Sequence, residues 1–244
     1  MADILSIEGV TKSFGAFAAL ESTDLRIAEG EFVCLIGASG CGKSTLLRIV
    51  AGFETATAGH VISAGREVTG PGPERGMVFQ DYGLFPWLSV RDNIGFGPAA
   101  RGLPKAKIRE ITNRFIDMVG LSKFAAAYPH QLSGGMKQRV AIARVLANDA
   151  RVVLMDEPFG ALDAMTRERL QDELLEIWAR TKLTVIFVTH AIEEAILLAD
   201  RVVAMAPNPG RIISDTKISL QRPRDVASQP FNDLRRILSA RLHG

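Results

Sequence analysis

The chain has 244 residues, of which 47% are hydrophobic and 23% charged, a balance typical of a folded globular protein rather than a disordered one. Its formal net charge is only +2, so it lacks the whole-molecule basic field of many nucleic-acid-binding domains. Its two cysteines, Cys34 and Cys41, are too few for a disulfide framework and indicate a reducing compartment.

The N-terminal region predicts strands followed by a Gly-rich loop and a helix. Alternating apolar residues over 4–10 and 18–27 predict a pair of strands. The apolar run EFVCLI (31–36) predicts a buried strand, and LLRIVAG predicts a helix that ends at Gly52. Between them, GASGCGKST (37–45) has the spacing G-x-x-x-x-G-K-[ST].

This spacing is typical of a phosphate-binding loop. Glycines let the backbone curl so that successive N–H groups point at a polyphosphate, and the helix that follows adds the positive end of its dipole. Lys43 supplies a charge for the outer phosphates, and the hydroxyl of Ser44 suits Mg²⁺. The predicted nucleotide-binding residues of the loop are Gly37, Ala38, Ser39, Gly40, Cys41, Gly42, Lys43, Ser44 and Thr45. We expect the Cys41 thiol to be open to ligand.

The rest of the chain predicts an α/β fold. The run HVIS, within a Gly- and Pro-rich stretch, predicts a peripheral antiparallel strand, and GMVF predicts a strand that ends at Gln80. Residues 81–149 predict a helical insert, in which Ile108, Ile111, Phe115 and Met118 have helical spacing. The continuous apolar runs 152–155 and 184–189 predict strands buried on both faces, as in a parallel sheet.

Polar residues follow several of these buried strands. If the strands are parallel neighbours, then Gly37, Gln80, the pair Asp156 and Glu157, and His190 meet at one sheet edge, where ligands of open α/β sheets bind. Asp156, with Ser44 and Gln80, is placed to hold Mg²⁺. Glu157 is the candidate to deprotonate an attacking water, with His190 and Gln80 assisting at the γ-phosphate and the water.

A second anion site is predicted at LSGGMKQR, where Ser133 is a candidate N-cap and Gly134 and Gly135 leave bare backbone N–H groups at the start of a long helix.

Together these motifs resemble the ATP-binding subunit of an ABC transporter over nearly all of residues 4–206. The matching stretches, in family order, are GASGCGKS, VFQD, LSGGMKQR, VVLMDE, GALD (160–163) and VTH. The resemblance implies a P-loop nucleoside triphosphatase core (1–206) with a mainly parallel sheet, a peripheral antiparallel β subdomain and a helical insert (81–149), then a short extension (207–244). It implies ATP and Mg²⁺ as cofactors.

The same resemblance implies how subunits assemble. Two copies, or two homologous subunits, would pack head to tail, so that the phosphate loop of one faces Ser133, Gly134 and Gly135 of the other across ATP, with Asp163 in the loop nearby. Phe14, rather than Phe17, would stack on adenine. Trp87, in GLFPWLS, is expected to contact an integral membrane permease subunit, although packing at the root of the helical insert is the alternative.

Met136, where the family usually has glutamine, together with GLFPWLSVRDNI (83–94) and PNPGRI (207–212), resembles the branch that imports nitrate, sulfonate and taurine. The chain would then energise uptake of a small anion, indirectly with a solute-binding protein and without nucleic acid. The alternative is an ABC-type ATPase of DNA repair or one associated with ribosomes; the first usually carries a coiled coil or zinc insertion, and the second two ATPase heads.

The C-terminal segment is locally basic, with eight Lys or Arg against three Asp over 201–244. A solvated surface tail is the favoured interpretation, and contact with a membrane surface or a partner is the alternative.

No apolar run approaches the roughly 18 residues of a membrane helix, and MADILSIEGV lacks the features of a signal peptide. The chain is therefore expected to stay in the cytosol, and the resemblance implies a peripheral subunit at the cytoplasmic face of the inner membrane.

Overall fold

The computed structural model of the chain describes residues 3–160 and 162–243, and the fold divides into two compact units. The first unit combines Met1–Pro71 with Lys182–Gly244, and the second is Gly72–Thr181. The predicted α/β class is confirmed: both units contain parallel strands with helices. None of the helices in the described ranges has the length and apolar character needed to cross a membrane.

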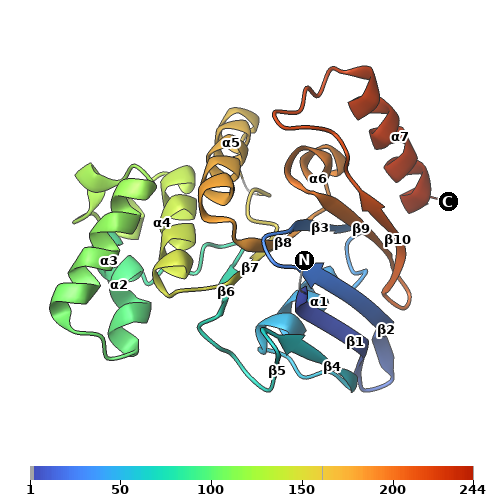
Figure 1. Cartoon of the computed structure of the whole chain (residues 1–244), viewed down its shortest axis with the longest axis horizontal. Coiled ribbons are helices and arrows are strands. Elements are labelled where there is room, and N and C mark those ends of the chain that lie inside the picture. The colour runs from blue at the N-terminus through green and yellow to red at the C-terminus, as the bar shows by residue number, and fades with distance from the viewer. Residues whose placement is uncertain (1–2, 161, 244) are drawn as a thin grey trace. The chain divides into compact units, whose positions relative to one another are not determined.

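The first unit contains a mostly parallel set of strands (Figure 1). Their order is β10 (Arg211–Lys217), β9 (Arg201–Ala206), β3 (Phe32–Gly37) and β8 (Thr184–Thr189). Strand β3 runs parallel to both β8 and β9, whereas β10 is antiparallel to β9. Every residue of β3 and β8 is buried, which explains their continuous apolar sequences.

An antiparallel sheet forms the rest of the β structure of this unit. Its order is β2 (Phe17–Ala28), β1 (Asp3–Phe14), β4 (Ala58–Ser63) and β5 (Arg66–Glu67). The hairpin between β1 and β2 turns at Gly15, whose φ of 58° suits glycine. The predicted first two strands and the HVIS strand are therefore confirmed.

Three helices complete the first unit: α1 (Lys43–Ala51), α6 (Ile192–Leu198) and α7 (Gln229–His243). Helix α1 ends at Gly52, which caps it in the left-handed conformation. Helix α7 lies beside α6 (Figure 1), and its Phe231 and Leu238 are buried. Arg224, before α7, is also only 8% exposed. The interpretation of this segment as a solvated tail is therefore wrong for Arg224 and for the apolar face of α7, although the basic residues Arg211, Lys217, Arg235, Arg236 and Arg241 are exposed.

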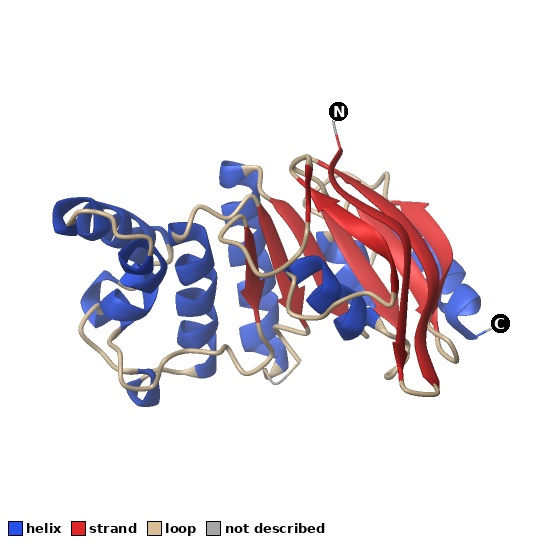
Figure 2. Cartoon of the chain, turned by 90° about the horizontal axis from the view of Figure 1, so that it is seen from below, coloured by secondary structure: helices blue, strands red, loops and turns tan. Residues whose placement is uncertain are grey.

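The second unit pairs two parallel strands and packs helices side by side (Figure 2). Its strands are β6 (Arg75–Val78) and β7 (Val152–Asp156), in register from Arg75↔Val152 to Val78↔Met155. Its helices are α2 (Val90–Ala100), α3 (Lys105–Met118), α4 (Gly134–Ala147) and α5 (Ala164–Thr181), with 3-10 turns η1 (Ser122–Phe124) and η2 (Pro129–Gln131). On α5, Leu170, Leu174 and Ile177 have helical spacing and are buried.

Candidate functional site

The Gly-rich loop connects β3 to α1, and its residues 38–40 are exposed to solvent. Glycine is required at its two ends by close contacts. A Cβ on Gly37 would lie 2.4 Å from the carbonyl oxygen of Met205, and one on Gly42 would lie 2.4 Å from Leu20 Cδ2. Gly42 also has a φ of 90° and is the N-cap of α1. The loop therefore has the curled backbone that an anion site at a helix N-terminus needs.

Lys43 begins α1 and turns its side chain back into this loop. Its ammonium donates to the carbonyl oxygens of Gly37 at 2.7 Å and Ala38 at 3.0 Å, and the side chain is buried. A buried ammonium requires such partners, because its water is lost. The loop thus already holds a positive charge at its centre, next to the half-buried Ser44 and Thr45.

Cys41 lies inside the loop, but its thiol is not open to solvent. The residue is fully buried, and its Sγ lies 3.6 Å from Lys43 Nζ. The expectation of an accessible thiol is wrong, because the curl of the backbone turns this side chain inward, whereas Ala38 and Ser39 of the same loop are exposed.

His190 and the Gly-rich loop follow neighbouring strands and lie at the same edge of the sheet. Strands β3 and β8 are parallel neighbours with Ile36 opposite Thr189, so Gly37 and His190 follow paired positions. The His190 side chain is exposed, and the turn that carries it is fixed by Thr189 Oγ1, which accepts from Ala191 N at 3.0 Å. The structure therefore brings together the loop and one of the predicted polar residues.

Phe14 and Phe17 face each other across the tip of the β1–β2 hairpin and are both about half exposed. Lys12 Nζ lies 4.8 Å from the centre of the Phe14 ring, a cation–π contact that Phe17 lacks among the contacts described. Both rings are free to meet a planar ligand on one face.

In the second unit, β6 ends at Val78, two residues before Gln80 and earlier than predicted, and β7 ends at Asp156, which Glu157 follows. A Cβ on Gly160 would be 3.8 Å from both Gln80 Nε2 and Glu157 Oε2, so these two side chains border the same small space. Glu157 has a φ of 45°, which is uncommon for a residue with a side chain and is frequent at functional sites. Asp156 and Glu157 are half-buried.

Ser133 is the N-cap of α4, as predicted: its Oγ accepts from Met136 N at 3.3 Å. A Cβ on Gly134 would meet Leu162 Cδ2 at 3.1 Å and Tyr82 Oη at 3.2 Å. The start of this helix is therefore close to the segments that follow Gln80 and Glu157.

Asp163 caps the next helix. Its Oδ1 accepts from Thr166 N at 3.0 Å, and this backbone hydrogen bond, as the largest cause, lowers the pKa of the carboxyl. Ala161, which belongs to the same GALD stretch, lies outside the described residues.

Two residues that the sequence did not single out organise this region. Arg144 of α4 donates to the carbonyl oxygens of Gly83 at 2.6 Å and Tyr82 at 3.2 Å, and burial lowers its pKa. Asn93 is fully buried, and its amide bonds both the N–H and the carbonyl of Phe85. The sequence signal for each residue was a polar side chain within a helical stretch. Such a signal is common and does not by itself indicate a structural role.

No cluster of three or more His, Cys, Asp or Glu that could hold a metal occurs among the described residues. A Mg²⁺ ion shared with nucleotide phosphates does not need one, since it keeps water and phosphate ligands and takes only one or two from the protein.

Comparison with known proteins gives a consistent result. A protein-family model described as "ABC transporter" matches residues 20–160. An "uncharacterized ABC transporter ATP-binding protein" of Methanocaldococcus jannaschii is 53% identical over 236 residues, covering 95% of this chain and 88% of the relative. A "nitrate import ATP-binding protein" of Synechocystis is 50% identical over 206 residues, covering 84% of this chain and 77% of the relative.

Two solved structures share the fold. A cbiO1 protein of Clostridium perfringens, part of an ABC transporter complex, has a TM-score of 0.83 at 28% identity and covers 100% of this chain and 97% of its own. A dimeric ATP-binding cassette with ADP and Pi, in a post-hydrolysis state, has a TM-score of 0.76 at 31% identity and covers 89% of this chain and 100% of its own.

Proposed function

Because the chain belongs to the ABC transporter family and is one of its ATP-hydrolysing subunits, we propose that it energises the import of a small anion such as nitrate, sulfonate or taurine. The similarity to a nitrate import subunit supports this solute class. So do Met136 and the stretches 83–94 and 207–212, which resemble that branch. The observation that carries the proposal is the curled loop before α1 with Lys43 buried at its centre.

The loop residues 37–45 would hold the nucleotide phosphates. The backbone of the exposed residues 38–40 offers N–H donors, and Lys43 would exchange its loop carbonyls for phosphate oxygens. Phe14 would stack on adenine, which its exposure and position at a hairpin tip support. Bound Mg²⁺ would neutralise phosphate charge, with Ser44, Gln80 and Asp156 as its protein ligands or hydrogen-bond partners.

Glu157 would take the proton of the attacking water, and Gln80, which borders the same space, would orient that water or a metal ligand. His190 would hydrogen-bond the γ-phosphate from the sheet edge that also carries Gly37. These assignments divide the work between orientation and proton transfer, which is the usual protein contribution to phosphoryl transfer.

The second anion site supports a head-to-tail dimer. Ser133, Gly134 and Gly135 begin α4 with backbone N–H groups that a phosphate from a second subunit could satisfy, and Asp163 lies at the start of α5 nearby. The partner would be another copy of this chain or a homologous ATPase subunit.

For the domain organisation, we propose an ATP-binding domain over 1–206, with the insert 81–149, and an extension over 207–244.

A hollow of about 700 Å³ between α2 and α3 suits a membrane permease subunit. Its wall includes Phe96, whose ring lies 4.5 Å from Phe85, and Phe85 in turn contacts Trp87 at 5.7 Å. Trp87 is 70% exposed, which argues against the packing alternative. A short cytoplasmic helix of the permease would bury these rings, and the chain would sit at the cytoplasmic face of the inner membrane.

The test is ATP hydrolysis measured with the purified chain alone and with permease subunits in vesicles, DNA or ribosomes. Stimulation by the permease, increased further by solute-loaded binding protein, is expected. Stimulation by DNA or ribosomes alone would contradict the import proposal and favour the alternative.

A further inference from the structure

Helix α6 begins two residues after His190, and it is short. Its seven residues, Ile192–Leu198, are too few to form a stable helix without tertiary support. The last four carbonyl groups of any helix have no partner within the helix. Here those carbonyls belong to residues 196–199, and all of them accept from two arginines that lie more than twenty residues further along the chain.

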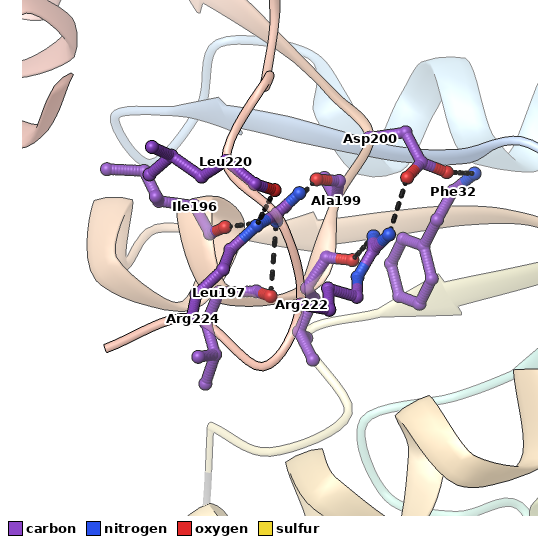
Figure 3. A network of polar contacts seen from close by, with 9 residues as sticks. Phe32, Ile196, Leu197, Ala199, Asp200, Leu220, Arg222 and Arg224 are labelled. Carbon is purple, nitrogen blue, oxygen red and sulfur yellow. Dashed lines mark hydrogen bonds and ion pairs between the residues drawn. The ribbon is translucent and has the colours of Figure 1, made fainter. Parts of the chain in front are cut away.

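Arg224 makes most of these bonds (Figure 3). It donates to the carbonyl oxygens of Ile196, Leu197 at 3.2 Å, Ala199 at 2.7 Å and Leu220 at 3.0 Å. Burial, with the nearby charge of Arg222 as the next cause, lowers the pKa of Arg224 to about 10, so it stays charged at neutral pH. A guanidinium at a helix C-terminus also complements the negative end of the dipole.

Arg222 extends this network to the strand that carries the phosphate loop. It donates to Leu198 O and to Asp200 Oδ1, the latter at 2.6 Å, and Asp200 Oδ2 accepts from Phe32 N at 3.0 Å (Figure 3). Phe32 is the first residue of β3. The end of α6 is thus tied to the start of β3.

The other end of α6 meets the C-terminal helix. Arg235 of α7 donates to Glu193 in the first turn of α6 at 2.6 Å. His190 and the α7 residues Arg235, Arg236 and Ser239 line one hollow of about 500 Å³. Residues after 207 therefore contact α6 at both of its ends.

We propose that Arg224 is a positioning residue for His190: by capping α6, it fixes the turn from which His190 reaches the γ-phosphate. Arg222 supports this cap by donating to Leu198 O at the same end of α6. The C-terminal extension is then part of the ATP-sensing apparatus, although it lies outside the residues matched by the family model. This inference rests on the role proposed above for His190.

The test compares ATP with ADP, because only ATP has a γ-phosphate. Affinities for both are measured by titration calorimetry in a Glu157→Gln background, which prevents hydrolysis. His190→Ala should lower the preference for ATP over ADP about tenfold, the loss of one hydrogen bond to a charged group. Arg224→Lys, which keeps the charge but not the fork of donors, should lower it several-fold and leave ADP affinity unchanged.

Combining the two substitutions separates positioning from general destabilisation. In the His190→Ala protein, Arg224→Lys should have no further effect on the preference for ATP, since both act through one contact. The matched control is Arg241→Lys on α7, an exposed arginine that bonds only Thr216 Oγ1 among the contacts described; it should change nothing. If Arg224→Lys does not fold, Arg222→Lys, whose side chain is 23% exposed, takes its place.

Three results for Arg224→Lys would overturn the inference. The protein could keep the full preference for ATP, lose affinity for ATP and ADP equally, or still show weakened ATP binding when His190 has been replaced. Those results leave the proposed function intact. If His190→Ala itself keeps the preference, the role of His190 fails and the inference fails with it.

Discussion

At the scale of single residues, Lys43 carries the positive charge of the phosphate loop. Its buried ammonium is held by Gly37 O and Ala38 O, so the free protein keeps it ready at the point where the outer phosphates would lie. Lys43→Ala should weaken ATP binding by at least about tenfold, since hydrogen bonds between charged groups are the strong ones. Calorimetry with ATP measures this loss.

The exposed Lys123→Ala is the control for Lys43 and should bind ATP normally. Circular dichroism should show that both proteins are folded. Near-normal hydrolysis by a folded Lys43→Ala protein would sink the assignment of the loop.

The two thiols should both resist alkylation in the folded protein. Cys34 is fully buried within β3, and burial, as the largest cause, raises its pKa well above the usual value, so the reactive thiolate is scarce. Cys41 is buried as well. Labelling with iodoacetamide, followed by mass spectrometry, should give slow modification of both, and rapid modification after denaturation.

The raised pKa of Cys34 also has a consequence for stability. The folded state holds the thiol proton more tightly than the unfolded state. The contribution of Cys34 to the free energy of unfolding is therefore full below the unfolded thiol pKa and declines as the pH rises above it.

Rapid labelling of either native cysteine near neutral pH would contradict the burial of the two thiols.

At the scale of elements, the C-terminal turn of α1 depends on glycine for two reasons. Gly52 has a φ of 82°, and a Cβ there would lie 2.2 Å from the backbone oxygen of Gly70. Gly65 has a similar φ of 75° but open space around it. Gly65→Ala should therefore cost about 1–2 kcal/mol, for the left-handed conformation alone. Gly52→Ala should cost about 1–3 kcal/mol more, because backbone must move.

Urea unfolding followed by circular dichroism compares these two variants with the parent chain. Equal losses of stability would show that the close approach of Gly52 to Gly70 does not matter.

Elements with a strong local signal were predictable from sequence. Strand β8 covers the same six residues as the apolar run 184–189, and Gly52 ends α1 as expected. On α3, by contrast, Ile108 and Phe115 are half-buried, and Thr112 and Ile116 are the buried residues. Spacing identifies a helix and an approximate face, but the neighbouring elements decide which side chains are covered, and Ile108 instead lines the hollow beside Phe96.

The environment of Arg224 could not be predicted, because its partners are carbonyl groups about 25 residues away, and backbone groups carry no sequence signal. The basic composition of this segment predicts solvated side chains, whereas two of its arginines, Arg222 and Arg224, cap a helix. The prediction that the Cys41 thiol is accessible was wrong for a similar reason. The sequence places Cys41 in an exposed loop, but the direction of its side chain is set by the curl of the backbone. The phosphate loop was predictable because close contacts require glycine at Gly37 and Gly42, and the spacing of these residues is visible in the sequence.

At the scale of the whole molecule, the exposed ring of Trp87 should matter for assembly and not for nucleotide binding. Trp87→Ala should leave ATP affinity of the isolated chain unchanged but weaken binding to the permease by about 2 kcal/mol or more, as loss of an aromatic anchor does. Co-purification and surface plasmon resonance with permease vesicles measure this.

The matched control for Trp87 is Phe124→Ala, another exposed aromatic residue of the same unit, which lies in η1. Unchanged assembly together with a chain destabilised by several kcal/mol would support the packing alternative.

The dimer tests the mechanism as a whole. ATP should hold two subunits together, because each nucleotide would satisfy the phosphate loop of one chain and the N-terminus of α4 on the other. Glu157→Gln keeps the shape of the side chain but removes its basicity, so ATP should bind without being hydrolysed. The Glu157→Gln protein should therefore accumulate as an ATP-bound dimer, measured by size-exclusion chromatography with light scattering.

Adding a substitution at Ser133 then distinguishes this arrangement from any other dimer. Ser133→Arg puts a long side chain at the facing contact and should return the Glu157→Gln protein to monomer at saturating ATP. Ser133→Ala removes the hydroxyl that accepts from Met136 N without adding bulk, so an intact ATP-bound dimer of this variant excludes loss of the helix cap, worth about 1 kcal/mol, as the cause. A dimer indifferent to Ser133→Arg, or wild-type hydrolysis by Glu157→Gln, would falsify the two-site mechanism, since the γ-phosphate could then not be what joins the subunits.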